Sequence, residues 1–192
     1  MGALRLGVLG GTFDPIHVGH LVLAQEARWQ LSLDRVLLVP AGEPWRKAGR
    51  AITPFPMRVE MVRLAAEGGD YLEVSTLEGD RPGPSYTVDT LESLLASHPG
   101  ARLVLILGED ALADLPNWKD AERIAELAEI AVAQRPGNDA SDSGIRWTPI
   151  DMPKMEISSS TIRERAGRGE PFEAFLCPAV AAYIHEHGVY GG

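Results

Sequence analysis

Residues 4–20 read LRLGVLGGTFDPIHVGH, which sets a strand, a glycine turn and a helix start one after another. Leu4–Leu9 is an apolar run of the kind that forms a buried parallel strand. The pair Gly10-Gly11 lets the backbone approach a ligand closely and take positive φ where needed. Pro15 fixes the loop, and the next helix is expected to begin around Gly19. Because the amides at a helix N-terminus attract anions, this succession predicts a phosphate site.

Strand-like and helix-like segments alternate through most of the remaining chain. Further strands are expected at Arg35–Val39, Leu72–Val74, Leu103–Leu107, Ile130–Ala133 and Ile145–Ile150, and helices at His20–Leu31, Met57–Ala66, Val88–Leu95 and Ala121–Leu127. Alternation at this pace implies right-handed crossovers, so the sequence predicts an α/β fold with a doubly wound, mostly parallel sheet. Ligands of such sheets bind beyond the carboxyl ends of the strands, where the strand order reverses.

The pattern changes near the end of the chain. From Ser158 onward it is wholly helical, with helices expected at Ser160–Arg168 and Pro178–His187. We therefore expect a single domain over residues 1–192, in which residues 158–192 form a small C-terminal helical subdomain. The segments Gly42–Pro56 and Gly137–Gly144 are expected to be open loops.

The amino-acid composition limits which kinds of binding partner and which cellular compartment are expected. The chain has 192 residues, a net charge of −9 and one cysteine, Cys177. A net negative charge argues against a broad nucleic-acid surface, although a few cations in one cleft suffice for a nucleotide. A single cysteine permits no internal disulfide and no thiolate cluster, which suits a cytoplasmic protein. The apolar stretch at the N-terminus is too short for a signal peptide or a membrane-spanning helix.

His17 and His20 are three residues apart at the expected helix start, which places both rings on one face. Two unrelated histidines or a metal pair would give the same spacing, but neither would need the glycine turn beside it. A helix terminus stabilises an anion by roughly 0.3–1 kcal/mol. Enzymes lower barriers by at least about 8 kcal/mol, so histidines and cations must supply most of the charge stabilisation.

A second phosphate-binding pattern lies at residues 157–163, which read ISSSTIR. Ser158 or Ser159 is a natural N-cap for the following helix, and its unpaired amides and hydroxyls can hold a phosphate. Arg163 lies one turn inside the helix and can reach back with a bidentate fork. An ordinary capped surface helix is the alternative.

Together these segments resemble the nucleotidyltransferases of the His-x-Gly-His class. Within that class, five segments are similar to bacterial nicotinate-nucleotide adenylyltransferases: Pro84–Leu91, Leu107–Asp110, Trp118, Gln134–Gly137 and Tyr183–Tyr190. The resemblance covers nearly the whole chain and implies a Rossmann-like nucleotidyltransferase fold. It also implies the reaction, in which the 5′-phosphate of nicotinate mononucleotide attacks the α-phosphorus of ATP and pyrophosphate leaves. Mg²⁺ would be carried by the triphosphate, with no dedicated metal site on the protein.

The resemblance also implies a set of ATP-binding residues. His17, His20 and Arg163 would be catalytic, with His20 the more critical histidine. The ATP site would comprise Gly10, Gly11, Thr12, Phe13, His17, His20, Lys47, Ile157, Ser158, Ser159 and Arg163. Lys47 could equally be a solvated charge, because Glu43–Lys47 departs from the usual family pattern, so its role stays open together with those of Trp45 and Arg46.

The mononucleotide site implied by the resemblance would comprise Thr12, Ser85, Tyr86, Thr87, Asp110, Trp118 and Arg135. Trp118 would stack on the pyridine ring, and backbone amides near Thr87 and Trp118 would recognise the carboxylate. Asp110 would bind a ribose hydroxyl. From the residues alone, Trp118 could be a core aromatic and Asp110 a helix cap, and the role of Arg135 stays open.

Other functions fit parts of the pattern. A related adenylyltransferase could use nicotinamide mononucleotide or phosphopantetheine as acceptor, although the latter group usually carries Thr-x-Gly-His. A non-catalytic nucleotide-binding domain would be expected to lose a histidine or Arg163, and this chain keeps them. No nucleic-acid or membrane partner is expected, and the sequence leaves open the oligomeric state and the choice between the two pyridine mononucleotides.

Overall fold

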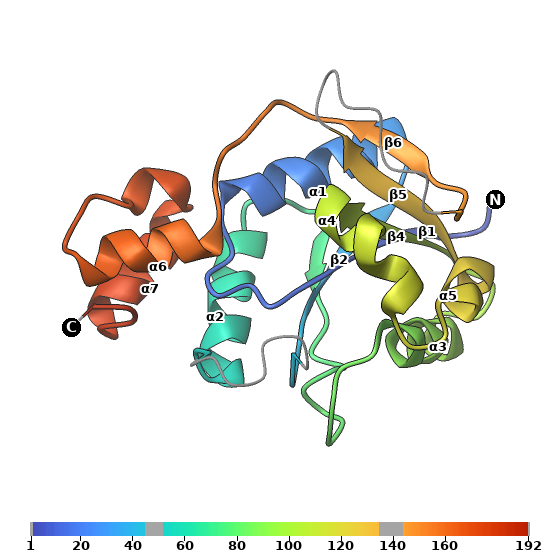
Figure 1. Ribbon diagram of the computed structural model, residues 1–192, viewed down its shortest axis with the longest axis horizontal. Helices are drawn as coiled ribbons and strands as arrows, with labels where there is room; N and C mark the ends of the chain where they lie inside the picture. Colours follow the sequence, from blue (N-terminus) through green and yellow to red (C-terminus); the bar gives the residue numbers. More distant parts are fainter. Residues whose placement is uncertain (1, 45–51, 135–143, 192) are drawn as a thin grey trace.

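A central parallel sheet organises the computed structural model, which describes residues 2–44, 52–134 and 144–191. Its strands are β1 (Arg5–Gly11), β2 (Arg35–Pro40), β3 (Leu72–Val74), β4 (Arg102–Gly108), β5 (Ala128–Gln134) and β6 (Thr148–Asp151). They lie in the order β3-β2-β1-β4-β5-β6, and every neighbouring pair is parallel. The predicted doubly wound α/β fold is confirmed (Figure 1).

Helices connect the strands and continue beyond the last one. They are α1 (Val18–Gln30), α2 (Phe55–Ala66), α3 (Thr87–Ser97), α4 (Glu109–Asp114), α5 (Ala121–Leu127), α6 (Ser159–Gly167) and α7 (Pro178–Glu186), with 3₁₀ turns η2 (Leu115–Asn117) and η3 (Glu173–Phe175). Helix α4 was not expected, because six residues are too few to show a helical period. The strand expected at Ile145–Ile150 is β6, which begins three residues later.

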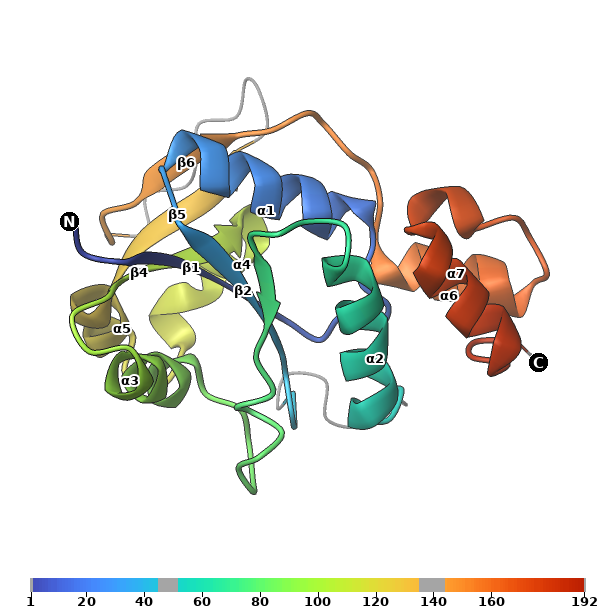
Figure 2. The ribbon, with the colours of Figure 1, turned by 180° about the vertical axis from the view of Figure 1, so that it is seen from behind.

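Alternating side chains of the strands pack against helices on both faces of the sheet. Leu38, Val104 and Ile106 face one side and share a hydrophobic cluster with α1 and α2. Leu37 and Leu105 face the other side and share a second cluster with α3, α4 and α5. Burial on both faces explains why the strands are continuously apolar rather than alternating in polarity. Figure 2 shows the helical layers from behind.

The strand order reverses between β1 and β4, so the crossovers that leave these two strands run in opposite directions. The ends of β1 and β2 are level, because Gly11 pairs with Pro40, and β4 ends at Gly108 on the same edge. Crevices at such a reversal are where open α/β sheets bind their ligands. The glycine turn predicted from the sequence therefore lies at the switch point.

The backbone after β1 differs in detail from the prediction. Gly10 and Gly11 belong to β1 and neither has positive φ. Phe13 takes the left-handed conformation instead, with φ 48°, and its buried ring leaves 2% of the residue exposed. The space beside Gly10 is open, because a Cβ added there would meet nothing within 4 Å, so a ligand can approach the backbone at this position. Helix α1 begins at Val18, close to the expected start around Gly19 and two residues before the apolar pattern His20–Leu31.

The C-terminal helices pack against α2, on the side of the sheet that α1 and α2 cover. Ile162 of α6 and Val180 and Ile184 of α7 are buried in the same hydrophobic cluster as α2. In Figure 1 these helices extend from the sheet beside α2. The division into a domain and a 158–192 subdomain stays a prediction. Within the described ranges, no helix combines the length and apolar character needed to cross a membrane.

Candidate active site

Two histidines stack at the start of α1. The ring centroids of His17 and His20 are 3.8 Å apart with an interplanar angle of 26°. The backbone N–H of His17 donates to Nδ1 of His20 at 3.2 Å, so the neutral His20 ring carries its proton on Nε2. The edge of Phe13 packs against His20 with centroids 5.0 Å apart. The rings of His17 and Phe13 and this hydrogen bond help to fix the His20 ring.

His17 is held as a neutral donor or acceptor. Its side chain is buried, and Nδ1 has no hydrogen-bond partner among the described residues. Burial lowers the pKa of His17 to about 4, because the charged imidazolium would lose its hydration. A Cβ at Gly19 would lie 3.1 Å from Nδ1, so the glycine at this position keeps the space beside the ring open. A buried unpaired nitrogen is the arrangement expected where a ligand completes the hydrogen bond.

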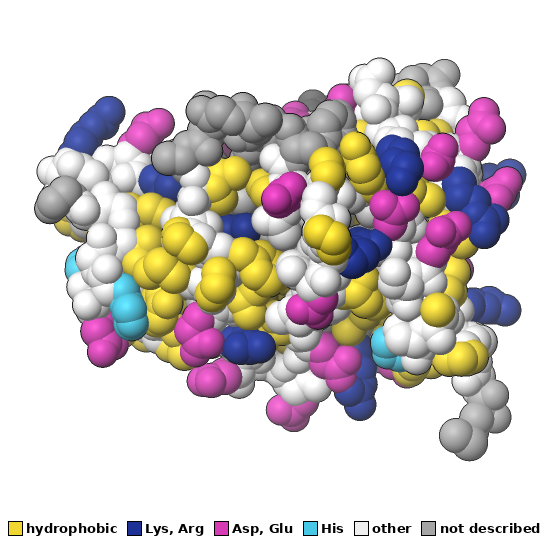
Figure 3. Space-filling view, turned by 90° about the horizontal axis from the view of Figure 1, so that it is seen from below, with side chains coloured by type: hydrophobic (Ala, Val, Ile, Leu, Met, Phe, Trp, Pro, Cys, Tyr) yellow, Lys and Arg dark blue, Asp and Glu magenta, His cyan; other side chains and the backbone are white. Residues whose placement is uncertain are grey.

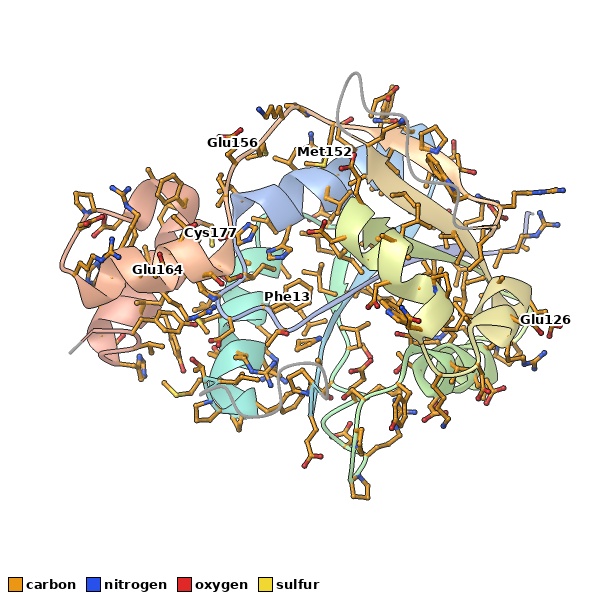
Figure 4. The ribbon with its side chains drawn as sticks, viewed as in Figure 1. Phe13, Glu126, Met152, Glu156, Glu164 and Cys177 are labelled. Carbon is orange, nitrogen blue, oxygen red and sulfur yellow. The ribbon has the colours of Figure 1, made fainter. Side chains whose placement is uncertain are left out.

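The start of α6 meets the turn that follows β1. Ser158 caps α6 by accepting the N–H of Thr161 at 3.1 Å. Ser159 donates to the carbonyl of Pro15 at 2.9 Å. The structure therefore brings together the two phosphate-binding patterns, which are more than 140 residues apart in the chain. Figure 4 shows Phe13 in the turn and Glu164 on the neighbouring α6.

Arg163 joins the same two segments through its guanidinium. Nη1 donates to the carbonyl of Asp14 at 2.7 Å, and Nη2 donates to Oγ of Ser160 at 3.2 Å. These contacts use two of the five N–H donors of an arginine, which leaves three for a bound anion. Arg163 thus reaches back toward its own helix start through Ser160 and also contacts the turn, whereas its bidentate contact with a phosphate stays a prediction.

Asp14 is buried in the turn and was not singled out from the sequence. Its Oδ1 accepts the hydroxyl of Tyr190 at 2.7 Å, and its Oδ2 accepts the N–H of Thr53 at 3.4 Å. Asp14 is 3% exposed. Its place within the quoted turn could have marked Asp14 as a candidate site residue. Its two partners lie 39 and 176 residues away, so sequence spacing could not have predicted these contacts.

Arg58 is a buried arginine of α2 that holds the turn after β1 and the loop after β2 through hydrogen bonds to their carbonyls. It is 1% exposed, and it donates to the carbonyls of Thr53 (2.9 Å), Thr12 (2.7 Å), Ala41 (2.8 Å) and Gly42 (3.3 Å). Burial lowers the pKa of Arg58, and the nearby Asp14 carboxylate opposes that shift. Its helical spacing from the apolar positions 61, 62 and 65 could have indicated a place on the buried face.

Ser85 ties the segment before α3 to the loop after β2. Its Oγ accepts the N–H groups of Gly42 (3.0 Å) and Glu43 (3.2 Å), and its own N–H donates to the carbonyl of Glu43 at 3.0 Å. Tyr86 and Thr87 follow, with Tyr86 at the N-cap of α3. The predicted mononucleotide residues 85–87 therefore lie beside the β1–β2 end of the sheet.

Trp118 is half-buried rather than part of the core interior. Its Nε1 donates to Asp114 at 3.2 Å, and its ring packs at the edge of the cluster that includes α3. The next residue, Lys119, lies over the ring of Tyr86 at 4.7 Å and bonds to Asp89 of α3 at 3.1 Å. The segments that contain Trp118 and Tyr86 are thus adjacent, as the predicted shared subsite requires.

Asp110 lies in the first turn of α4, directly after β4. It lines a cavity of about 300 Å³ with Gly108 and Gln134 at the carboxyl ends of β4 and β5. Gly108, not Asp110, is the N-cap of α4, so the capping alternative for Asp110 is wrong. Ile157 is half-buried just before α6. Lys47 and Arg135 lie outside the described residues, as do Trp45 and Arg46.

Known proteins match this chain over nearly its whole length. The cytidylyltransferase-like family matches residues 8–165. A protein of Roseiflexus sp. (strain RS-1), described as "Probable nicotinate-nucleotide adenylyltransferase", is 46% identical over 99% of this chain and 100% of its own length. One from Thermomicrobium roseum with the same description is 43% identical over 97% of this chain and 91% of its own. The chain belongs to the nicotinate-nucleotide adenylyltransferase family.

Solved structures show the same fold at lower identity. The Plasmodium falciparum nicotinic acid mononucleotide adenylyltransferase complexed with NaAD has a TM-score of 0.80 and is 20% identical, with 97% of each chain covered. At this identity the likeness extends to the fold alone. Family membership agrees with the parallel sheet, the histidine turn and the serine–arginine segment found in this chain.

Proposed function

We propose that this protein transfers the adenylyl group of ATP to nicotinate mononucleotide, forming nicotinate adenine dinucleotide and pyrophosphate in NAD biosynthesis. The observation that carries the proposal is that Ser159 and Arg163 join the start of α6 to the turn between β1 and α1, at the strand-order reversal. Two helix N-termini, the two stacked histidines and the guanidinium of Arg163 are then gathered around the turn after β1. This combination of hydrogen-bond donors and positive charge suits a polyphosphate. The family indicates that this polyphosphate is the triphosphate of ATP.

Chemically, an oxygen of the mononucleotide 5′-phosphate forms a bond to the α-phosphorus of ATP. The bond from the α-phosphorus to the oxygen that bridges to the β-phosphorus breaks, and that electron pair leaves with pyrophosphate. No enzyme residue becomes covalently attached. The protein aligns two phosphates and stabilises the charge that develops on the oxygens of the transferring phosphorus.

Individual side chains have separable tasks in this reaction. His17 Nδ1 hydrogen-bonds to a phosphate oxygen, which completes its unpaired buried nitrogen. His20 donates from Nε2, the protonated nitrogen set by its contact with the His17 backbone. Arg163, Ser158 and Ser159 bind the triphosphate with Ile157 beside them, and the backbone of Gly10–Phe13 lines the nucleotide cleft. Lys47 belongs to the same proposed site.

The acceptor occupies the neighbouring part of the cleft. Trp118 stacks on the pyridine ring, and the amides near Thr87 and Trp118 bind its carboxylate beside Ser85 and Tyr86. Asp110 binds a ribose hydroxyl, and Thr12 and Arg135 complete the proposed mononucleotide site. The adjacency of the Tyr86 and Trp118 segments supports this assignment, as does the cavity at Asp110.

A magnesium ion enters with ATP in this proposal, because triphosphates bind Mg²⁺ through their own oxygens. Its chemistry is the neutralisation of phosphate charge. Within residues 2–44, 52–134 and 144–191, no three His, Cys, Asp or Glu side chains are grouped to hold a metal ion. The carboxylate in the turn, Asp14, is engaged by Tyr190 and Thr53.

The remaining expectations concern partners and location. In Figure 3, hydrophobic side chains and side chains of both charge signs are interspersed over the visible face, with no extended basic patch on that face. The lack of a nucleic-acid or membrane partner and the cytoplasmic location stay predictions. The oligomeric state stays open.

The assay is release of pyrophosphate from ATP, Mg²⁺ and nicotinate mononucleotide by wild type and His20→Ala. We expect the variant to lose at least about a hundredfold in kcat, the scale of removing one well-aimed transition-state donor. His98→Ala is the matched control, because His98 ends α3 near the start of β4, at the opposite edge of the sheet. A His20→Ala enzyme with near-normal kcat would remove His20 from the mechanism.

A further inference from the structure

Five hydrogen bonds from distant parts of the chain converge on the turn between β1 and α1. Arg58 donates to the carbonyl of Thr12, and Ser159 to that of Pro15. The other three all go to Asp14, whose carbonyl and two carboxylate oxygens are each engaged. Asp14 is therefore the residue of the turn through which most of this support passes.

Tyr190 makes the contact to Asp14 from the last part of the chain. Helix α7 ends at Glu186, and Gly188 turns the chain with φ 60°. Val189 then donates to the carbonyl of Ile184 at 3.0 Å and is buried, which directs the next residue back toward the turn. Tyr190 lies there with its hydroxyl 2.7 Å from Oδ1 of Asp14.

The backbone at Tyr190 is itself unusual. Its φ of 68° lies in the left-handed region, which a bulky side chain seldom occupies unless its surroundings hold it there. Phe13, on the other side of the contact, has φ 48°. The donor of this hydrogen bond, Tyr190, and the residue before its acceptor, Phe13, are thus both non-glycine residues in the left-handed region. Such outliers gather where a particular placement is needed for function.

Burial and the contact with Asp14 raise the pKa of Tyr190, so the phenol keeps its proton and donates to the carboxylate. The same Asp14 accepts Nη1 of Arg163 through its carbonyl at 2.7 Å. Tyr190 and Arg163 are therefore linked through one intervening residue. A shift of Asp14 would move the oxygen on which the guanidinium rests.

We propose that Tyr190 is a positioning residue for adenylyl transfer: its hydroxyl fixes Asp14, which in turn aligns Arg163 with the triphosphate. The proposal rests on the proposed function for the identity of the bound phosphate. Arg163 touches ATP, whereas Tyr190 acts through Asp14 and does not. The C-terminal residues thus take part in the nucleotide site without lining it.

The test is a double-mutant cycle between Tyr190→Phe and Arg163→Ala. Tyr190→Phe is expected to lower kcat/KM for ATP about tenfold, with KM for the mononucleotide changed less than twofold. In the Arg163→Ala background the same substitution is expected to change kcat/KM less than threefold, because the group it aligns is gone. A role confined to folding would instead lower activity by the same factor in both backgrounds.

Tyr183→Phe is the matched control, because it removes a hydroxyl from α7 on a ring that stacks on His187, 4.1 Å away. It should leave both kinetic constants unchanged. Wild-type kcat/KM for ATP in a folded Tyr190→Phe enzyme would overturn the proposal, as would a full tenfold loss in the Arg163→Ala background. If Tyr190→Phe does not fold, Asp14→Asn replaces it in the cycle under the same criteria.

A failure of the proposed function is distinguishable from a failure of this link. If the wild type forms no dinucleotide, the proposed function fails, whatever the variants do. Calorimetric titration with ATP then reads the link directly: Tyr190→Phe should weaken ATP binding about tenfold in the presence of Arg163 and less than threefold in its absence. Equal affinities of wild type and Tyr190→Phe would overturn the positioning role.

Discussion

Replacing Arg58 by Met should destabilise the fold strongly, because this side chain is buried and holds four carbonyl oxygens. The carbonyls belong to Thr12, Ala41, Gly42 and Thr53, and its four contacts range from 2.7 to 3.3 Å. Removing one partner of a buried charged network costs about 3–5 kcal/mol, since the remaining groups lose donors they cannot regain from water. We expect the free energy of unfolding to fall by that amount.

The assay is urea denaturation followed by circular dichroism, with the midpoint and the slope fitted separately. Arg63→Met is the matched control on the same helix, since Arg63 is exposed and its ion pair with Glu60 is 3.7 Å long. That control should change the free energy of unfolding by less than about 0.5 kcal/mol. A folded Arg58→Met protein within about 1 kcal/mol of wild type, roughly a fivefold change in the unfolding equilibrium, would refute this reasoning.

Three further outcomes follow from the structure. Because burial lowers the pKa of His17 to about 4, the unfolded chain takes up a proton below pH 6.5 that the folded protein does not. The free energy of unfolding of the wild type should therefore fall by about 3 kcal/mol more than that of His17→Asn between pH 7 and pH 4; parallel pH profiles would contradict the burial of a neutral His17. Trp118→Ala should raise KM for the mononucleotide about tenfold with KM for ATP unchanged, since stacking on a base is worth about 1–3 kcal/mol; an unchanged mononucleotide KM would return the ring to a packing role. Gly42→Ala should lower the free energy of unfolding by about 1–3 kcal/mol, because its Cβ would overlap the carbonyl oxygen of Glu78, whereas Gly68→Ala meets its nearest atom at an ordinary 3.7 Å; equal melting temperatures for the two would show that the backbone at Glu78 yields to the added methyl group.

The fold could be predicted because its signals are local and repeated. Each long strand is a short apolar run, and each large helix shows an apolar face, so their alternation sufficed for a parallel sheet. Helix α4 was not predicted, because its six residues, Glu109–Asp114, include only one buried residue, Leu112, and so show no helical spacing of apolar side chains. The start of β6 was missed because Ile145 and Trp147 are apolar without belonging to the strand.

The site was predictable where the residues follow one another in the chain. His17 and His20 lie at one helix start, and Ser158 through Arg163 at another, so their chemistry could be recognised separately. Their meeting depends on contacts across more than 140 residues. No spacing rule relates such segments, and the resemblance to a family, rather than physics, first suggested that they share a ligand.

The supporting residues could not be recognised by type. Arg58 was not singled out from the sequence, and Tyr190 was named only as the last residue of the segment Tyr183–Tyr190. Their roles follow from their partners, the carbonyl of Thr12 and the carboxylate of Asp14. Asp14 lies within the quoted turn, but three of its oxygens accept hydrogen bonds from three distant parts of the chain: helix α6, the loop before α2 and the segment after α7. Such roles arise from tertiary structure, because the donors come from segments that fold together from distant parts of the chain.

The central claim is tested most directly by measuring dinucleotide formation from ATP and Mg²⁺ with either nicotinate or nicotinamide mononucleotide as acceptor. We predict that nicotinate mononucleotide yields its adenine dinucleotide and pyrophosphate in equal amounts, at an initial rate well above that with nicotinamide mononucleotide. No product above the enzyme-free blank, or a faster reaction with the nicotinamide substrate, would contradict the claim.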